Sequence, residues 1–275
     1  MAPIDYSQWR DDTLQKRLVN VRGHKMSYWA TDLRTERPTI LFVHGITGDN
    51  NGLVPLAREF EATHNLILIE LPGHGDSARL DLHAARDLQN WFQRALEAIC
   101  NSVIPVDLII AHSFGCSAVV KTKKIDTILL CPVPSPSRLY RQYARIIQQL
   151  APFWALFYSW KIFIWLRGTT LRKVNTRDAR RRVRWVGWQA QASYAQIIYQ
   201  ARLVDVILDV TAYETISKRV KLVICGLEDT TARERDTAEL NQVFQTAPVE
   251  FLRGGHLLPI ESPQRVAQRI KRLTT

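Results

Sequence analysis

The stretch Ile-Ile-Ala-His-Ser-Phe-Gly-Cys at residues 109–116 runs from an apolar segment into a turn of small residues and then into a helical pattern. It is close to Gly-x-Ser-x-Gly, the motif of a sharp strand-to-helix turn that presents a nucleophilic serine, with Ala111 in place of the first glycine. Alanine adds one methyl group, so the turn remains feasible. In this turn Ser113 would stand above the sheet and the amide of Phe114 would point toward a developing oxyanion. The stretch predicts a nucleophilic Ser113, whereas the simpler alternative is an ordinary helix N-cap.

Short β-rich runs alternate with helical patterns on both sides of this stretch, which favours a mostly parallel sheet covered by helices. The runs are rich in Ile, Val and Leu, as is typical of strands buried on both faces. The predicted strands are an antiparallel opening pair at 17–22 and 24–30, turned at Gly23, and then 39–43, 65–71, 106–111, 125–131, 221–225 and 249–252. The predicted helices are 52–62, 82–100, 114–121, 232–244 and 262–273.

The composition is that of a globular protein. Of 275 residues, 46% are hydrophobic and 23% are charged, which excludes a disordered tail, a linker or a solenoid. Four widely spaced cysteines without a Cys-x-x-Cys pair predict buried free thiols in a reducing compartment rather than disulfides or a zinc site. The first thirty residues contain no apolar run of signal-peptide length. We therefore expect a cytoplasmic protein.

One segment differs from the rest of the chain in charge and aromatic content. Residues 133–216 carry 13 basic and 4 acidic side chains, a net charge of +9, whereas the rest of the chain carries only +2. Five of the eight tryptophans lie in the same segment. Pro132, Pro134 and Pro136 stand at its start. This shift predicts an inserted segment with a task of its own.

A second strand-to-turn pattern lies at residues 40–48, Ile-Leu-Phe-Val-His-Gly-Ile-Thr-Gly. A loop after a strand near the nucleophile is expected to supply a second oxyanion donor, and the backbone N–H of Ile46 is the candidate. Gly45 allows the backbone to approach closely. His44 is a base by residue type, but a histidine beside this turn is expected to hydrogen-bond the loop backbone. The alternative for the whole pattern is a plain strand-ending turn.

A nucleophilic serine needs a base, and the base needs an acid that orients it. Residues 221–229 predict a strand whose following turn ends in two carboxylates, and residues 249–256 predict another strand followed by two glycines and His256. The Gly-x-x-Asp pattern favours Asp229 as the acid over its neighbour Glu228. The order Ser113, Asp229, His256 is that of an α/β-hydrolase triad.

Taken together, these motifs resemble the α/β-hydrolase fold, in particular its lid-bearing esterases, lipases and C–C hydrolases. The resemblance covers nearly the whole chain and is carried by His44-Gly45, Leu71-Pro72-Gly73-His74-Gly75-Asp76-Ser77, Ala111-His112-Ser113-Phe114-Gly115, Gly226 to Asp229 and Gly255-His256. Ala111 departs from the usual glycine, and Arg219 stands where many relatives have proline. Members that are haloalkane dehalogenases or epoxide hydrolases use an aspartate at the turn, so Ser113 argues against both.

The resemblance implies an eight-stranded, mostly parallel sheet with a helical cap inserted after the sixth strand. It places the core at 1–132 and 213–275 and the cap at 133–212. The implied activity is hydrolysis of a carboxylic ester with a hydrophobic acyl or alcohol group, with no cofactor and no metal. Two alternatives are a C–C bond hydrolase acting on an anionic diketone or dienoate, and a noncatalytic binding module of the same fold.

The neighbours of the proposed triad have structural interpretations. His112 is expected to pack with its side chain away from the pocket. His74 and Glu70 are expected to hold the loop after the strand at 65–71. None of the three is expected to transfer protons.

The segment from 150 to 166 reads LAPFWALFYSWKIFIWL, with Lys161 as its only formal charge, and eight basic residues follow it up to Arg184. It is too short and interrupted for a confident transmembrane span. One interpretation is a cap helix with solvated arginines; another is an interfacial element that binds anionic lipid, which would make the protein peripherally membrane-associated. An anionic substrate or partner is a third. We do not expect nucleic acid binding, because no recognised binding module accompanies the arginines.

Overall fold

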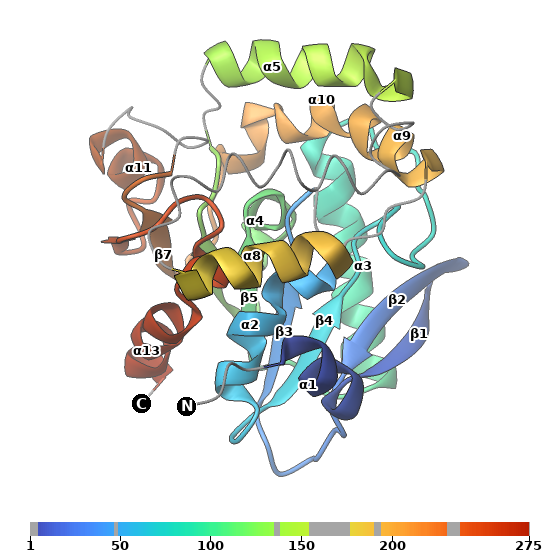
Figure 1. Ribbon diagram of the computed structural model, residues 1–275, viewed down its shortest axis with the longest axis vertical. Helices are drawn as coiled ribbons and strands as arrows, with labels where there is room; N and C mark the ends of the chain where they lie inside the picture. Colours follow the sequence, from blue (N-terminus) through green and yellow to red (C-terminus); the bar gives the residue numbers. More distant parts are fainter. Residues whose placement is uncertain are drawn as a thin grey trace.

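The computed structural model describes residues 5–46, 49–134, 138–153, 177–189, 194–229 and 237–274. In this part of the chain one eight-stranded sheet has the order β1-β2-β4-β3-β5-β6-β7-β8 (Figure 1). The strands are β1 (Gln15–Val21), β2 (His24–Ala30), β3 (Thr39–Val43), β4 (Asn65–Ile69), β5 (Leu108–His112), β6 (Asp126–Leu130), β7 (Val220–Gly226) and β8 (Val249–Leu252). β2 pairs antiparallel with β1 and β4, and all other pairs are parallel. The predicted fold class, a mostly parallel α/β sheet of the α/β-hydrolase type, is confirmed.

Both faces of the central strands are buried, because every second residue of a strand points to the opposite face. All five residues of β3, β4 and β5 are buried. On one face Leu41, Ile109 and Leu129 belong to one apolar cluster, and on the other face Ile40 and Ile110 belong to a second. The strands are continuous apolar runs because both faces of the sheet are covered by other apolar side chains.

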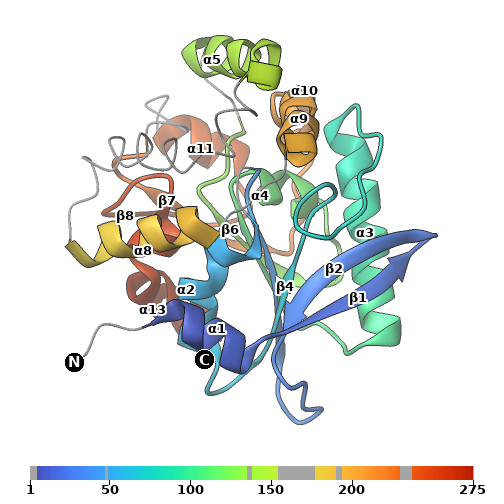
Figure 2. The same cartoon turned by 45° about the vertical axis from the view of Figure 1, so that its right-hand side comes forward.

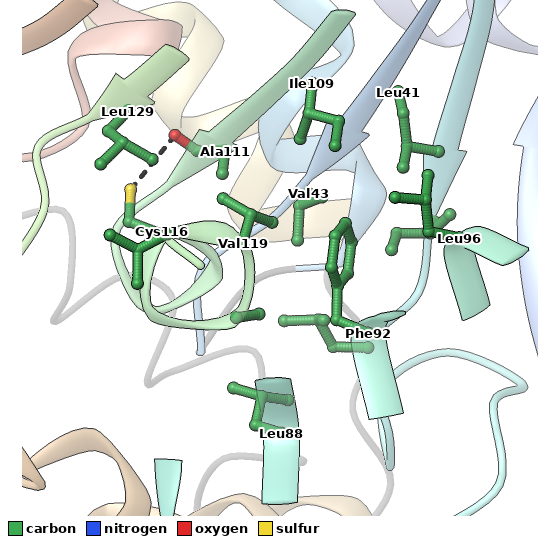
Figure 3. Packing of buried hydrophobic residues seen from close by; sticks show 14 of the residues in the cluster. Leu41, Val43, Leu88, Phe92, Leu96, Ile109, Ala111, Cys116, Val119 and Leu129 are labelled. Carbon is green, nitrogen blue, oxygen red and sulfur yellow. Dashed lines mark hydrogen bonds between the residues drawn. The ribbon is translucent and has the colours of Figure 1, made fainter. Parts of the chain in front are cut away.

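Helices form the two covering layers. The first face packs against α3 (Ala85–Ser102) and α4 (Phe114–Val119), whose buried side chains meet those of β3, β5 and β6 in Figure 3. The second face packs against α1 (Tyr6–Thr13), α2 (Val54–Ala57), α12 (Leu258–Glu261) and α13 (Pro263–Thr274). The remaining short elements of this frame are η1 (Asn50–Leu53), η2 (Arg58–Phe60) and α11 (Thr237–Val243). The layers hold the carboxyl ends of the parallel strands at one edge of the sheet.

The segment between β6 and β7 contributes α5 (Arg138–Gln149), α8 (Arg177–Gln189), α9 (Tyr194–Arg202), α10 (Val204–Ile207) and η4 (Val210–Tyr213). α5 packs on α9 and α10, whereas α8 lies apart from them against α12 and η1 (Figures 1 and 2). The inserted segment therefore meets the frame at two separate places. Its role as a cap, and the boundaries 133 and 212, remain predictions.

The predicted strands are confirmed to within two residues at each end, whereas the helices are less regular than predicted. The helix predicted at 52–62 is three short pieces, with Pro55 in the first turn of α2. α1 and α12 were not predicted from the sequence. The first residues of the helix predicted at 232–244 and most of the segment 150–166 lie outside the described residues. Among the described helices, none combines the length and the apolar character that a membrane crossing requires.

Candidate active site

Ser113 stands between β5 and α4 in a strained turn. Its φ of 53° and ψ of −119° lie in a region that residues with side chains rarely adopt, at a cost of about 1–3 kcal/mol. The backbone N–H of Ser113 continues the sheet by donating to the carbonyl of Leu130, 2.9 Å away. Its side chain is half-buried. The turn therefore raises the hydroxyl above the end of the sheet, as the sequence predicts for a nucleophile.

Gly115 and Ala111 make this turn feasible in different ways. A Cβ atom on Gly115 would lie 2.6 Å from the carbonyl oxygen of His44 and 2.7 Å from that of Val43, so only glycine fits between α4 and the end of β3. Ala111 is fully buried in β5, and its carbonyl accepts a hydrogen bond from Cys116 Sγ (Figure 3). The alanine methyl is thus absorbed by the core without opening the turn.

The structure brings Ser113, His256 and Asp229 together. Ser113 Oγ lies 2.7 Å from His256 Nε2, and Asp229 Oδ2 lies 2.8 Å from His256 Nδ1. The side chain of Asp229 is 3% exposed and that of His256 is 19% exposed. In the tautomer that these partners select, Nδ1–H donates to the carboxylate and Nε2 accepts the serine proton. The arrangement can pass a proton from the hydroxyl to the imidazole.

Glu228, the alternative acid, has a different partner. Its carboxylate accepts a hydrogen bond from the backbone N–H of Gly254 and lies 3.9 Å from Arg253. The turn after β7 thus directs two adjacent carboxylates to two positions of the same loop. Asp229 meets the imidazole, and Glu228 holds the backbone that leads to it.

Two further contacts fix the loop of His256. A Cβ atom on Gly226 would lie 2.4 Å from the carbonyl oxygen of Gly255, so the turn after β7 and this loop can approach only because residue 226 is glycine. Glu261, at the end of α12, accepts a hydrogen bond of 2.9 Å from the N–H of Gly255. Burial raises the pKa of Glu261, and this backbone donor counteracts the rise. The residue before His256 is therefore anchored by a side chain.

His44, His74 and Glu70 hold the loops near the site, as predicted. His44 Nε2 accepts a hydrogen bond of 3.1 Å from the N–H of Leu71, and its Nδ1 donates to the carbonyl of Gly45. His74 Nε2 lies 2.5 Å from the carbonyl oxygen of Ile46. Glu70 accepts the N–H of Asp76 at 2.9 Å. Burial lowers the pKa of both histidines.

The two predicted oxyanion donors belong to the elements that surround Ser113. Phe114 is the first residue of α4 and directly follows the strained turn. Ile46 lies in the loop after β3, and the contact with His74 fixes its carbonyl. A Cβ atom on neighbouring Gly45 would lie 3.1 Å from Ser113 Cβ, so the loop after β3 passes directly beside the serine. The backbone segments that carry Phe114 and Ile46 thus both lie beside Ser113, and their role as oxyanion donors stays a prediction.

Arg182 differs from the expectation for the basic segment. The sequence predicts a solvated arginine, or one that faces lipid or an anionic substrate or partner. Its Nε instead donates to the carbonyl of Ile260 and its side-chain NH2 group to that of Glu261, both at 2.7 Å. On the same helix, Trp185 packs against the Tyr6 ring, with centroids 5.7 Å apart. Arginine satisfies these carbonyls because they lie at the C-terminal end of α12, which favours a cation. Arg180 and Arg181 are exposed.

Glu261 and Cys131 were given no role at the site from the sequence, and His112 was expected only to pack. His112 donates to the backbone of His256, Glu261 holds Gly255, and Cys131 lies close to Asp229 and His256. Each comes from an element whose position depends on the assembled sheet. A local signal existed only for His112, which directly precedes the serine.

The family pattern described as the alpha/beta hydrolase family matches residues 40–269 of this chain. The chain belongs to this family. The matched region contains all of the residues that surround Ser113. No curated protein matches this family member at a significant level.

Solved structures of the same fold differ in what their names say they do. An enol-lactonase from Burkholderia xenovorans LB400 is 15% identical to this chain, with a TM-score of 0.69. The superposition covers 94% of this chain and 100% of the enol-lactonase. A membrane phospholipase A, a bacterial virulence factor, is 18% identical with a TM-score of 0.68, covering 98% and 88%. The Cif epoxide hydrolase from Acinetobacter nosocomialis is 14% identical with a TM-score of 0.68, covering 100% and 99%. At these identities the likeness shows the fold alone.

Proposed function

We propose that this alpha/beta hydrolase family member is a serine hydrolase that cleaves carboxylic esters with a hydrophobic acyl or alcohol group. The observation that carries the proposal is the continuous line of hydrogen bonds from Ser113 Oγ through the imidazole of His256 to the buried Asp229 carboxylate, at 2.7 and 2.8 Å. The strained turn at Ser113 supports it, because such strain gathers at functional sites. A serine that served only as an N-cap would not need this base.

The first half-reaction forms an acyl-enzyme. Ser113 Oγ attacks the ester carbonyl carbon while His256 Nε2 takes the hydroxyl proton, and Asp229 stabilises the imidazolium. The carbonyl oxygen becomes an oxyanion that accepts hydrogen bonds from the amides of Phe114 and Ile46. Loss of one such donor reduces transition-state stabilisation by about 2.7–4 kcal/mol in a comparable site. The bond to the alcohol oxygen then breaks, and His256 gives the alcohol its proton.

The second half-reaction releases the acid. His256 removes a proton from a water molecule, whose oxygen attacks the acyl carbon. The tetrahedral intermediate uses the same two amides. When it collapses, Ser113 leaves as the alkoxide and takes the proton back from His256. Every proton is accounted for by groups of the site and by water.

The described arginines favour an ester over the anionic substrate of a C–C hydrolase. Such a substrate would require cations facing Ser113. Arg182 is engaged by the carbonyls of α12, and Arg181 is exposed. Relatives of the same fold include an enol-lactonase and a phospholipase A, and both names agree with ester chemistry.

We further propose that α5 and the residues after it contact an anionic membrane surface. Ile146 on α5 is 52% exposed, and Leu150 and Phe153, just after the end of this helix, are 41% and 66% exposed. Arg141 and Arg145 of the same helix are exposed. Apolar side chains beside arginines are typical of an element that lies in the headgroup region of anionic lipid. The occupant we propose is phospholipid rather than a protein, because the whole inserted segment is strongly basic.

The decisive experiment combines ester turnover with covalent labelling. Wild-type protein should hydrolyse short and medium p-nitrophenyl esters and react with a fluorophosphonate probe. Ser113→Ala should remove both activities, and His256→Ala should reduce both by at least about 1,000-fold while circular dichroism stays unchanged. Ser102→Ala, at the exposed end of α3, is the matched control. A wild-type protein that neither turns over esters nor forms a Ser113-dependent adduct is a noncatalytic binding module.

A further inference from the structure

Cys131, Asp229 and His256 form a mixed group of metal-ligand side chains. The Cys131 Sγ atom, one carboxylate oxygen of Asp229 and one ring nitrogen of His256 all lie within 4.8 Å of one another. The proposed hydrolytic reaction uses the histidine and the aspartate but gives the cysteine no task. The position of this third side chain is therefore unexplained by ester hydrolysis.

The backbone directs Cys131 toward this group. It follows β6 with a φ of 48°, and Ser113 and Arg22 are the other non-glycine residues with positive φ in the described part of the chain. The N–H of Cys131 donates to the carbonyl of Ile224 at 2.8 Å, which fixes it between neighbouring strands. Its Sγ lies 3.9 Å from the carbonyl oxygen of Gly255, the residue before His256. A strained residue held at the ends of β6 and β7 thus brings a thiol beside the imidazole.

The three ligand types suit zinc better than the common hard cations. Thiolate and imidazole favour Zn²⁺, whereas Mg²⁺ and Ca²⁺ favour oxygen ligands alone. Zinc binds sulfur at about 2.3 Å and nitrogen or oxygen at about 2.0–2.2 Å, so ligand atoms around a tetrahedral zinc are about 3.4–3.6 Å apart. The observed separations, at most 4.8 Å, need to change by only about 1 Å. A water molecule would take the fourth position.

We propose that Cys131, Asp229 and His256 form an inhibitory site for Zn²⁺. This inference rests on the proposed function, because it concerns the base of that reaction. On binding, the Cys131 thiol releases its proton to solvent and a zinc–sulfur bond forms, while the carboxylate and a ring nitrogen donate lone pairs. No electron is transferred. The ion enters past His256, whose side chain is 19% exposed, whereas Cys131 is fully buried.

Either ring nitrogen of His256 gives the same result. If zinc binds Nδ1, the proton of the neutral ring moves from Nδ1 to Nε2, which then has no lone pair for the Ser113 proton. If zinc binds Nε2, the lone pair that faces Ser113 is occupied directly. In both cases the hydroxyl loses its base. Bound zinc would therefore suppress ester turnover, and no chemical step of the reaction would release it.

The test uses the full-length protein after treatment with EDTA and removal of the chelator. Added ZnCl2 should reduce p-nitrophenyl ester turnover at least ten-fold at micromolar concentration, and EDTA should restore it. Cys131→Ser should keep the basal activity but require about 100-fold more zinc for the same inhibition, since even losing a residue that only orients a ligand weakens metal binding by about 10–100-fold. Cys100→Ser, in α3 and more exposed, should be inhibited like the wild type.

Cobalt supplies a measurement that does not depend on activity. Co²⁺ added to the Ser113→Ala variant should produce a thiolate-to-cobalt charge-transfer absorption that Cys131→Ser lacks and Cys100→Ser keeps. Equal zinc inhibition of wild type and Cys131→Ser, or absence of this absorption, overturns the site. If the absorption appears but the protein hydrolyses no ester, the metal site stands and only the proposed function fails.

Discussion

His112 donates a hydrogen bond from Nε2 to the backbone carbonyl oxygen of His256, over 2.7 Å. Burial lowers the pKa of His112 to about 3, so its ring is neutral at pH 7 and has a single N–H. The last residue of β5 therefore links the strand that carries Ser113 to the loop that carries the imidazole. The sequence predicts only a packing role for His112, whereas the structure shows that it joins the two halves of the site.

Replacing His112 should disturb catalysis without touching substrate. His112→Ala leaves the His256 carbonyl without this donor, so we expect kcat/KM for a p-nitrophenyl ester to fall about ten-fold and the free energy of unfolding to fall by about 1–3 kcal/mol. His112→Gln, which keeps an N–H donor, should recover part of both. Steady-state kinetics and urea unfolding measure them. His24→Ala, at the exposed start of β2, is the control, and a normal kcat/KM in His112→Ala contradicts the positioning role.

The two carboxylates after β7 should have separable effects. Asp229→Asn removes the charge that orients His256 and should lower kcat by up to about 10,000-fold, the size measured for a triad aspartate in a comparable enzyme. Glu228→Gln leaves that contact intact and weakens only the support of Gly254. We expect it to lower kcat by less than about ten-fold. Equal losses from both variants would show that the acid is wrongly assigned.

The contact of α8 with α12 should affect both stability and turnover. Arg182→Ala removes donors to two carbonyls at the end of α12, so the free energy of unfolding should fall by about 1.5–3 kcal/mol. Because Glu261 holds the residue before His256, kcat should fall more than KM rises. Arg181→Ala, one residue away and exposed, should change neither. Chemical denaturation and kinetics at saturating ester distinguish the two variants.

Acid should destabilise the protein through its buried histidines. Burial lowers the pKa of His44 well below 6.5 and that of His112 to about 3. Below pH 6.5 the unfolded chain binds protons at these positions and the folded chain does not, so stability falls as the pH falls. By pH 5.5 His112 should lower the free energy of unfolding by about 1.4 kcal/mol relative to pH 7.5, and His44 should add to the loss.

Urea unfolding at pH 7.5, 6.5 and 5.5 measures this loss. His112→Gln has no titrating ring and should show a smaller loss than the wild type, whereas His24→Gln, which is exposed, should lose as much. A stability that stays constant or rises toward pH 5.5 contradicts the neutral state of these rings.

The surface of α5 should bind anionic liposomes in a salt-dependent way. Wild-type protein should sediment with vesicles that contain phosphatidylserine at low salt and be released as the salt shortens the Debye length to about 8 Å. Phe153→Ser and Arg145→Gln should each weaken binding. Leu18→Ser, 56% exposed on β1, is the matched control because it removes a similar apolar side chain elsewhere. Equal binding to neutral and anionic vesicles at every salt concentration would falsify the electrostatic part.

The strands and the loop positions of the candidate site could be predicted because their signals are local. Buried parallel strands appear in the sequence as continuous apolar runs. Gly115 and Gly226 stand where two backbone segments approach closely, and both are visible in the sequence as glycines. α12 could not be predicted, since four residues carry no helical period. Arg182 and Cys131 could not be assigned, because each contacts residues about 80 to 125 positions away along the chain. Their partners exist only after the sheet has formed.

The distance of 143 residues along the chain between Ser113 and His256 has a consequence for synthesis. At about 5–20 residues per second, a ribosome adds the histidine roughly 7–30 s after the serine. During this interval the nascent polypeptide holds Ser113 without the base that the proposed mechanism requires. If the proposed function holds, the hydroxyl therefore stays unreactive beside the ribosome until β8 joins the sheet edge next to β7.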